Sequence, residues 1–291
     1  MVERTLDRAP AALPTMVRAA LPVIPGLNLI PGVARHGGDL PDLVLHRNGV
    51  QVDRDHVAAY AEVCGFEPSQ HLPFTYPHML AFGLHMAIMT DPAFPFPAIG
   101  TVHLANRITR HRQIAPSETL DVTATATNLR PHAKGKVFDF VTTVSSAGAA
   151  VWESTSEYLR LGKGDADVRP ERAPFDVVPG NGTVWHLPGN LGRRYAAVSG
   201  DHNPIHLYPL TAKALGFRRQ IAHGMWSKAR CVAAFESRLA AHATVEVEFK
   251  KPIFLPGKVA FGSRLVADGL DFSLTDPKSG APHLVGRARN A

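Results

Sequence analysis

Residues 195–214 read YAAVSGDHNPIHLYPLTAKA, and residues 223–225 read HGM. The first stretch places a carboxylate, Asp201, and an imidazole, His206, five positions apart between two segments of helical pattern. Gly, Asn and Pro at positions 200, 203 and 204 disfavour a continuous helix, so we expect both side chains to project from a turn. A carboxylate beside an imidazole is the pairing that proton-transfer chemistry needs.

The composition is that of a globular protein with a sizeable core. The chain has 291 residues, 45% of them hydrophobic, and a formal net charge of +6. The positive charge favours an anionic partner, which leaves nucleic acid, a phosphorylated small molecule and an acidic carrier protein to consider. The basic residues lie in short clusters (107–112, 218–219 and 250–251) that match no nucleic-acid-binding motif, so we expect no nucleic acid.

The cysteines and the N-terminal region indicate a reducing, cytoplasmic location. Cys64 and Cys231 both lie in apolar segments of helical pattern, which favours neither a disulfide framework nor a thiolate metal site. Prolines and charges interrupt the N-terminal region, so it has the pattern of neither a signal peptide nor a membrane span. We expect residues 1–45 to form an irregular arm on the body of the protein.

Two halves of similar layout flank a change in composition. Residues 163–182 are rich in charge, Gly and Pro and are predicted to be an interdomain linker between repeats at 46–162 and 183–291. Each repeat contains a short helix, a loop, a longer apolar helix and then strands. The expected helices span 53–65, 77–89, 191–199 and 224–237. The expected strands span 121–127, 137–144, 152–159, 245–249, 259–268 and 272–275.

The halves also match around the opening segment. Residues 60–66, YAEVCGF, resemble residues 195–201, YAAVSGD, at an offset of 135 positions, so Phe66 stands where the second half has Asp201. An internal duplication explains this match.

The first copy has lost the polar features that matter for chemistry. His71 lies opposite His206 at the same offset but has no carboxylate neighbour, and Met79 lies opposite Gly224 at an offset of 145. His71 is therefore predicted to be a relic, and we expect one active site per chain.

With these motifs, the chain resembles the MaoC-like or hydratase-2 family of (R)-specific enoyl-thioester hydratases and 3-hydroxyacyl-thioester dehydratases. Residues 199–206, SGDHNPIH, and 222–225, AHGM, carry the resemblance. It is good over residues 185–250, whereas the first half matches only in layout. The resemblance implies an α+β double hotdog: two antiparallel sheets, each wrapped round a central helix, joined edge to edge as a pseudo-dimer.

The resemblance also implies the roles of four residues. Asp201 and His206 would act on one water molecule as acid and base, in an order that the sequence does not fix. Gly224 would supply an oxyanion-binding N–H at the start of the central helix. Asn203 would support them, either by bonding the loop backbone or by orienting the water or His206. The reaction needs no cofactor, and the substrate would be a thioester of coenzyme A or of acyl carrier protein in fatty-acid metabolism.

Four further residues are candidates for substrate binding: His223, Met225, Phe66 and Met79. The last two replace polar features in the degenerate copy, so we expect that copy to favour a long acyl tail. His202 is expected to face solvent.

Metal binding is not expected. The chain has fifteen histidines but no HExxH or comparable spacing, and no phosphate-cradling glycine loop. Two other functions remain open: a hotdog acyl-thioesterase and a non-catalytic acyl-thioester-binding protein. Because one chain already contains two repeats, both a monomer and a homodimer of chains remain open.

Overall fold

A computed structural model describes residues 2–8, 38–168 and 175–290 of the chain. It contains two compact units that interleave along the sequence. Unit 1 comprises Met1–Gln51, His78–Leu104 and Thr119–Ala173, and unit 2 comprises Val52–Pro77, Ala105–Glu118 and Pro174–Ala291. These units do not test the predicted repeats, because a sequence repeat need not coincide with a compact unit. The boundaries at 46–162, 163–182 and 183–291 therefore stay a prediction.

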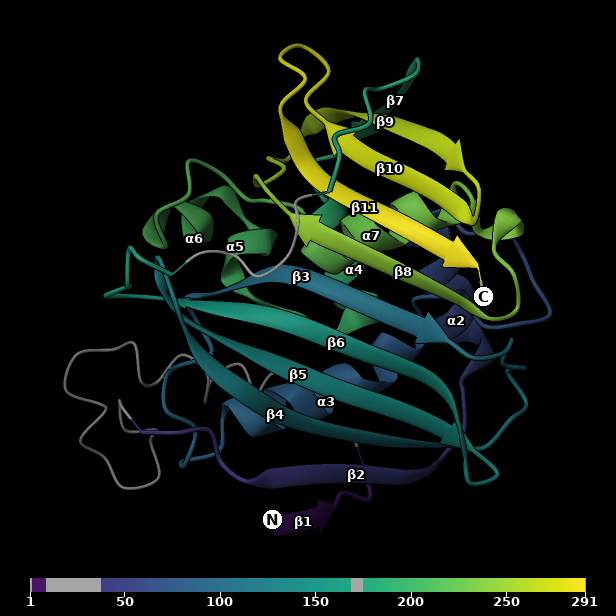
Figure 1. The fold of residues 1–291 in the computed structure, drawn as a ribbon, viewed down its shortest axis with the longest axis vertical. Helices are drawn as coiled ribbons and strands as arrows, with labels where there is room; N and C mark the ends of the chain where they lie inside the picture. The colour runs from purple at the N-terminus through teal and green to yellow at the C-terminus, as the bar shows by residue number, and fades with distance from the viewer. Residues whose placement is uncertain (1, 9–37, 169–174, 291) are drawn as a thin grey trace. The chain divides into compact units, whose positions relative to one another are not determined.

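Unit 1 is a sheet with one long helix. Its strands, in the order in which they pair, are β1 (Val2–Thr5), β2 (Leu43–Val50), β4 (Leu120–His132), β5 (Gly135–Ser146) and β6 (Ala149–Leu161). All neighbours pair antiparallel except β1 and β2, which are parallel. Helix α3 (Pro77–Met89) lies across one face of β4, β5 and β6 (Figure 1).

The core of unit 1 follows from the sequence of α3. This helix is apolar nearly all round, which is typical of a buried helix, and Leu84 and Ile88 are fully buried. His85 is buried with them. Its Nε2 lies 2.7 Å from Thr142 Oγ1, and its ring stacks on Phe140 with centroids 4.4 Å apart. The predicted helix at 77–89 is confirmed.

The predicted irregular arm at residues 1–45 is wrong at both of its described ends. Val2–Thr5 forms β1, which pairs with the first residues of β2, and β2 itself begins at Leu43. The physical reason is that pairing satisfies the backbone N–H and C=O groups of a segment too short for its side chains to show alternation. Residues 9–37 lie outside the described residues.

Unit 2 contains an antiparallel sheet. Its strands, in the order in which they pair, are β3 (Thr101–Arg110, of which residues 105–110 belong to unit 2), β8 (Ala243–Phe249), β11 (Pro282–Asn290), β10 (Gly269–Thr275), β9 (Gly257–Val266) and β7 (Thr183–Leu187). Every neighbouring pair is antiparallel.

Unit 2 also contains most of the helices. They are α2 (Arg54–Cys64), α4 (Leu191–Ser199), α5 (Pro204–Leu207), α6 (Pro209–Ala214), α7 (Gly224–Ala233) and the 3-10 helix η3 (Glu236–Arg238). The apolar residues of α7 face the core, where Ala229, Cys231 and Val232 are fully buried. Cys64 and Cys231 are both free and buried.

Strand β3 connects the two sequence repeats. It lies in the first half of the sequence but pairs with β8 of the second half, from Ala105 opposite Glu248 to Arg110 opposite Ala243. The repeats are therefore joined edge to edge through this pair of strands, as the resemblance implied. The pairing also covers an edge of the second sheet that would otherwise be open to another chain.

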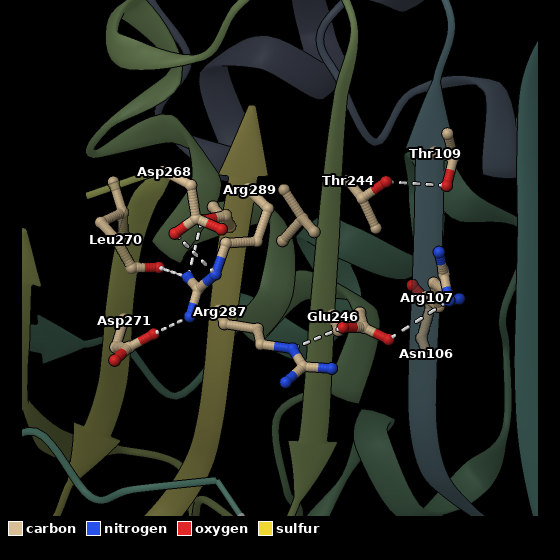
Figure 2. A network of polar contacts seen from close by, with 12 residues as sticks. Asn106, Arg107, Thr109, Thr244, Glu246, Asp268, Leu270, Asp271, Arg287 and Arg289 are labelled. Carbon is tan, nitrogen blue, oxygen red and sulfur yellow. Dashed lines mark hydrogen bonds and ion pairs between the residues drawn. The ribbon is translucent and has the colours of Figure 1, made fainter. Parts of the chain in front are cut away.

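A row of charged side chains crosses this part of the sheet (Figure 2). Glu246 accepts a hydrogen bond of 2.6 Å from Arg287 Nε and lies 3.7 Å from Arg107 Nη1, while Arg289 Nη2 donates to Asp271 at 2.7 Å. These pairs are partly exposed, so each contributes roughly 0–1 kcal/mol.

The ends of the helices support the internal duplication. Helices α2 and α4 both end at a glycine in the left-handed region, Gly65 with φ 76° and Gly200 with φ 74°. Helix α2 also has a capped N-terminus, because Asp53 accepts from the backbone N–H of Asp55 at 2.9 Å.

The predicted helix at 224–237 is too long at its C-terminal end. Helix α7 ends at Ala233, and the chain turns at Phe235 with φ −140° before η3 begins. This turn buries the Phe235 ring against Phe272, with centroids 4.9 Å apart, so tertiary packing ends the helix. Among the described residues, no helix is both long enough and apolar enough to cross a membrane.

Candidate active site

The segment from Asp201 to His206 combines a tight turn with a one-turn helix. Asp201 Oδ1 accepts from the backbone N–H of Asn203 at 3.1 Å, and Asn203 Oδ1 accepts from the N–H of Ile205 at 3.3 Å, capping α5. Asp201 therefore projects from a turn as predicted. The prediction is wrong for His206, which lies on α5, because Pro204 occupies the first helical position, where proline needs no N–H partner.

The hydrogen bond of His206 fixes the direction of its free nitrogen. The ring is 7% exposed, and its Nδ1 lies 2.8 Å from the backbone oxygen of Ile221. Because a carbonyl oxygen only accepts, Nδ1 carries the proton and Nε2 holds the lone pair in the neutral ring. Burial lowers the pKa of His206, while the charge of Asp201 and the Ile221 hydrogen bond oppose that shift.

Gly192 allows α5 to lie where it does. A Cβ at this position of α4 would stand 1.9 Å from the backbone oxygen of His206, so no other residue fits without moving α5. Gly192 is not among the site residues that the sequence predicts. The available signal was a glycine inside a helical pattern, which is costly unless packing requires it.

His223 completes a cluster with Asp201 and His206. Its Nε2 lies 3.0 Å from the backbone oxygen of Asp201 and 3.9 Å from Asp201 Oδ2. Its ring stacks on His206 with centroids 3.7 Å apart and an angle of 27° between the planes. Asp201 is half-buried whereas His223 is 3% exposed, so the carboxylate is the more accessible member of the cluster.

Gly224 begins α7 directly after His223. The first N–H groups of a helix have no carbonyl partner one turn earlier, so they are available to a developing negative charge. A Cβ at Gly224 would lie 3.2 Å from the Phe249 ring, a contact tighter than ordinary packing allows. A larger residue at position 224 would therefore have to displace the Phe249 ring.

The remaining candidates lie in several places. Met225 is buried on the first turn of α7, and Phe66 is buried against Tyr60 with ring centroids 6.1 Å apart. Met79 is half-buried on α3 in unit 1. Their part in binding substrate stays a prediction.

The other two histidines singled out in the sequence lie at the surface or close to it. His202 is exposed, as predicted, with Nδ1 3.1 Å from the backbone oxygen of Gly200. His71 is half-buried, and its backbone N–H donates to Ser69 Oγ.

By distance alone, Asp201, His206 and His223 could approach one metal ion, because one ligand-type atom from each lies within 4.8 Å of the others. The orientation of the rings argues against this. An imidazole lone pair lies in the plane of its ring, and two stacked rings do not direct both lone pairs at a point about 2.0–2.1 Å from each nitrogen. The expected absence of a metal stays a prediction that this geometry supports.

The arrangement suits a proton transfer at one small site. It offers a carboxylate, a neutral imidazole with a free Nε2 lone pair and a helix N-terminus, brought together by the contacts of His223 with Asp201 and His206. The first two can share a water molecule, and the third can stabilise an oxyanion.

Comparison with known proteins identifies a family domain that includes this site. Residues 190–272 match the MaoC like domain. Over 96% of its length, the chain is 35% identical to 3-hydroxyacyl-thioester dehydratase X of Mycobacterium tuberculosis, 98% of which is covered. The chain belongs to the MaoC-like dehydratase family.

One solved structure and one further relative agree with this MaoC-like assignment. The crystal structure of HtdX from M. tuberculosis superimposes with a TM-score of 0.76 at 34% identity, covering 85% of this chain and 100% of that one. Enoyl-CoA hydratase ChsH3 of the same organism is 26% identical over 178 residues, or 54% of this chain and 58% of its own length. The double hotdog predicted from the sequence is confirmed.

Proposed function

We propose that this MaoC-like chain catalyses the reversible hydration of trans-2-enoyl thioesters to (R)-3-hydroxyacyl thioesters. The observation that carries the proposal is the placement of Asp201 and the Nε2 lone pair of His206 at one site, beside the N-terminus of α7. Both relatives from M. tuberculosis carry names that describe this chemistry, one as a dehydratase and one as a hydratase.

The proposed reaction adds one water molecule across the double bond. The water oxygen bonds to the β-carbon, one water proton passes to the Asp201 and His206 pair, and the α-carbon receives a proton from that pair. Between these events the thioester oxygen carries negative charge, which the Gly224 N–H stabilises as a hydrogen-bond donor. Dehydration is the same path in reverse.

A thioesterase would cleave the carbonyl–sulfur bond instead, and an acyl-thioester-binding protein would cleave nothing. Crotonyl-CoA discriminates the three functions when loss of the conjugated double bond and release of free thiol are followed in the same sample. We expect loss of the double bond without thiol release, and an (R)-3-hydroxy product on chiral analysis. Thiol release at the same rate as substrate loss would establish hydrolysis, and an unchanged substrate would contradict any catalytic role.

The carrier of the acyl group is proposed to be coenzyme A or acyl carrier protein, since the net charge of +6 suits the anionic groups of both. Matched crotonyl thioesters of the two carriers separate them by kcat/KM. A carrier preference beyond about tenfold, or ~1.4 kcal/mol, would identify the true partner.

The degenerate repeat is proposed to accommodate a long acyl tail, because Phe66 and Met79 are apolar where the other copy is polar. Activity measured against acyl length tests this role. We expect turnover to persist well beyond four carbons, and a sharp fall after short chains would refute the idea.

A further inference from the structure

His223 lies in contact with both members of the acid–base pair, and the reaction proposed above gives its ring no task. We propose that His223 is a positioning residue. Its Nε2–H holds the backbone of Asp201 by a hydrogen bond, and its ring face fixes the orientation of His206 by stacking. The kinetic part of this inference rests on the proposed function, whereas its structural part does not.

The hydrogen bond to Asp201 determines the tautomer. The backbone oxygen of Asp201 accepts only, so the proton of His223 lies on Nε2, 3.0 Å away. Nδ1 is then an acceptor, and it is buried without a hydrogen-bond partner among the described residues. Nε2 therefore carries a proton, and a second proton on Nδ1 would be a buried donor without an acceptor among the described residues.

The same hydrogen bond restricts what Asp201 can do. The backbone N–H of Asp201 donates to Ser199 Oγ at 3.1 Å, its backbone oxygen accepts from His223, and its Oδ1 accepts from Asn203 N–H at 3.1 Å. Three of its four polar atoms are therefore engaged. Oδ2 is left to face the imidazoles and to take part in proton transfer.

Stacking orients His206 from the other side. Its Nδ1 is held by Ile221, and its face rests on His223 at 3.7 Å, so both the tilt and the rotation of the ring are fixed. The Tyr195 ring supports His223 in turn, with centroids 4.9 Å apart. A catalytic group held in this way loses little entropy when the reaction occurs.

His223 must stay neutral to do this, because a cationic ring would repel His206 whenever His206 accepts a proton. The ionisable groups that face His223 are Asp201, His202, His206 and Tyr195. Burial, followed by the nearby His206, lowers the pKa of His223 to about 3, although the charge of Asp201 opposes that shift. The ring is therefore neutral from pH 5 to pH 8.

The residue also links the loop to the oxyanion donor. The backbone oxygen of His223 accepts from both the N–H and the Oγ of Ser227 at 3.1 Å, which ties it to the first turn of α7. A shift of α7 therefore moves His223, and with it Asp201 and the Gly224 N–H together.

Two substitutions separate the effect of the Nε2–H donor of His223 from the effect of its ring stacked on His206. His223→Phe keeps a ring against His206 but removes the Nε2–H, whereas His223→Gln places an amide donor near the position of Nε2. With crotonyl-CoA as substrate, we expect His223→Phe to lower kcat by roughly 10²-fold with KM within about threefold, as misplaced catalytic groups do. His223→Gln should recover at least about fivefold of that loss. His202→Gln, on the exposed histidine of the same loop, is the matched control and should keep wild-type kcat.

A spectroscopic measurement tests the tautomer of His223 without requiring turnover. Long-range ¹H–¹⁵N spectra of the wild-type chain should show His223 as the neutral Nε2–H tautomer from pH 5 to pH 8. A protonated His223 at pH 6, or the Nδ1–H tautomer, would overturn the proposal, and so would wild-type kcat in His223→Phe or equal losses in both variants. A wild-type chain that leaves crotonyl-CoA unchanged would contradict the proposed function, while the spectra would still decide the tautomer.

Discussion

At the scale of single residues, Gly224 has two properties that different substitutions can separate: it has no Cβ, and its backbone N–H is free to donate at the start of α7. Alanine keeps the N–H but adds a Cβ that lies 3.2 Å from the Phe249 ring. Proline adds a Cβ at the same place and closes a ring onto the nitrogen, which removes the N–H. Proline is tolerated at the first position of a helix, and His223 before it has φ −66° and ψ 141°, a conformation that suits the residue before proline.

We therefore predict that Gly224→Pro lowers kcat by about 10²-fold or more relative to Gly224→Ala, because only the former removes the oxyanion donor. Steady-state kinetics on crotonyl-CoA measure the difference, and circular dichroism confirms that both variants are folded. Equal kcat in the two variants would mean that the N–H of Gly224 takes no part in the reaction.

The sequence predicted the reacting side chains better than their supports. Asp201, His206 and His223 stand in one short motif and one tripeptide, so their types and spacing were informative. Gly192 and the carbonyl of Ile221 hold His206 through main-chain contacts. Such contacts depend on how distant segments pack. The sequence marks the contact of Gly192 only by a glycine inside a helical pattern, and it gives no sign of the Ile221 carbonyl.

At the scale of elements, Lys228 is the least expected part of α7. It is fully buried, and its Nζ donates to the backbone oxygen and Oδ1 of Asn106 on β3 at 3.2 and 2.5 Å, and to the backbone oxygen of Val245 on β8 at 2.9 Å. One ammonium group thus has three acceptors for its three protons. It ties the helix that carries Gly224 to the strand pair that joins the repeats.

Lys228→Met is predicted to lower the free energy of unfolding by about 2–4 kcal/mol, because it leaves buried oxygens without a donor. Urea unfolding followed by circular dichroism measures the loss. Adding Asn106→Leu removes the orphaned side-chain oxygen and should restore part of the stability. If the double variant is less stable than Lys228→Met, the pairing is not what stabilises the junction.

Helices were predicted more closely than strands. The ends of α2, α3 and α4 follow from local signals, such as the capping Asp53 and the glycine at the end of α2. Strands β3 and β11 had no clear alternation, and they are ordered by partners far away in the sequence. Helix α5 was missed because four residues show no period, and proline at its start was taken as a break.

At the scale of the whole molecule, buried histidines make the stability depend on pH. Burial, then the nearby His78 and His103, lower the pKa of His85 well below its ordinary value, and the pKa of His223 falls to about 3. The unfolded chain binds protons at these residues near pH ~6.5. The stability is therefore fully present above that pH and is lost as the pH falls below it towards the folded pKa values.

We predict that the free energy of unfolding, and with it the urea midpoint, falls between pH 7 and pH 5. The free energy should fall by up to ~1.4 kcal/mol per histidine for each pH unit below ~6.5. His85→Gln keeps a polar group within reach of Thr142 but cannot be protonated, so its midpoint should depend less on pH. Equal slopes for this variant and the wild type would show that His85 does not titrate on unfolding.

The two-repeat design is proposed to give the chain one complete site and one altered copy. The same helix ends recur at Gly65 and Gly200, but only the second is followed by a carboxylate, since Phe66 stands where the other copy has Asp201. The copies share a fold because their apolar patterns are alike. They differ in chemistry through a few polar positions.

The central claim is that Asp201 and His206 together carry out proton transfer at this one site. Asp201→Asn tests it most directly, because the amide keeps an oxygen for the Asn203 N–H and changes little but the charge. With crotonyl-CoA, we predict a kcat lower by about 10²- to 10⁴-fold and an unchanged thermal unfolding midpoint. A folded Asp201→Asn variant with kcat within about twofold of the wild type would contradict the account.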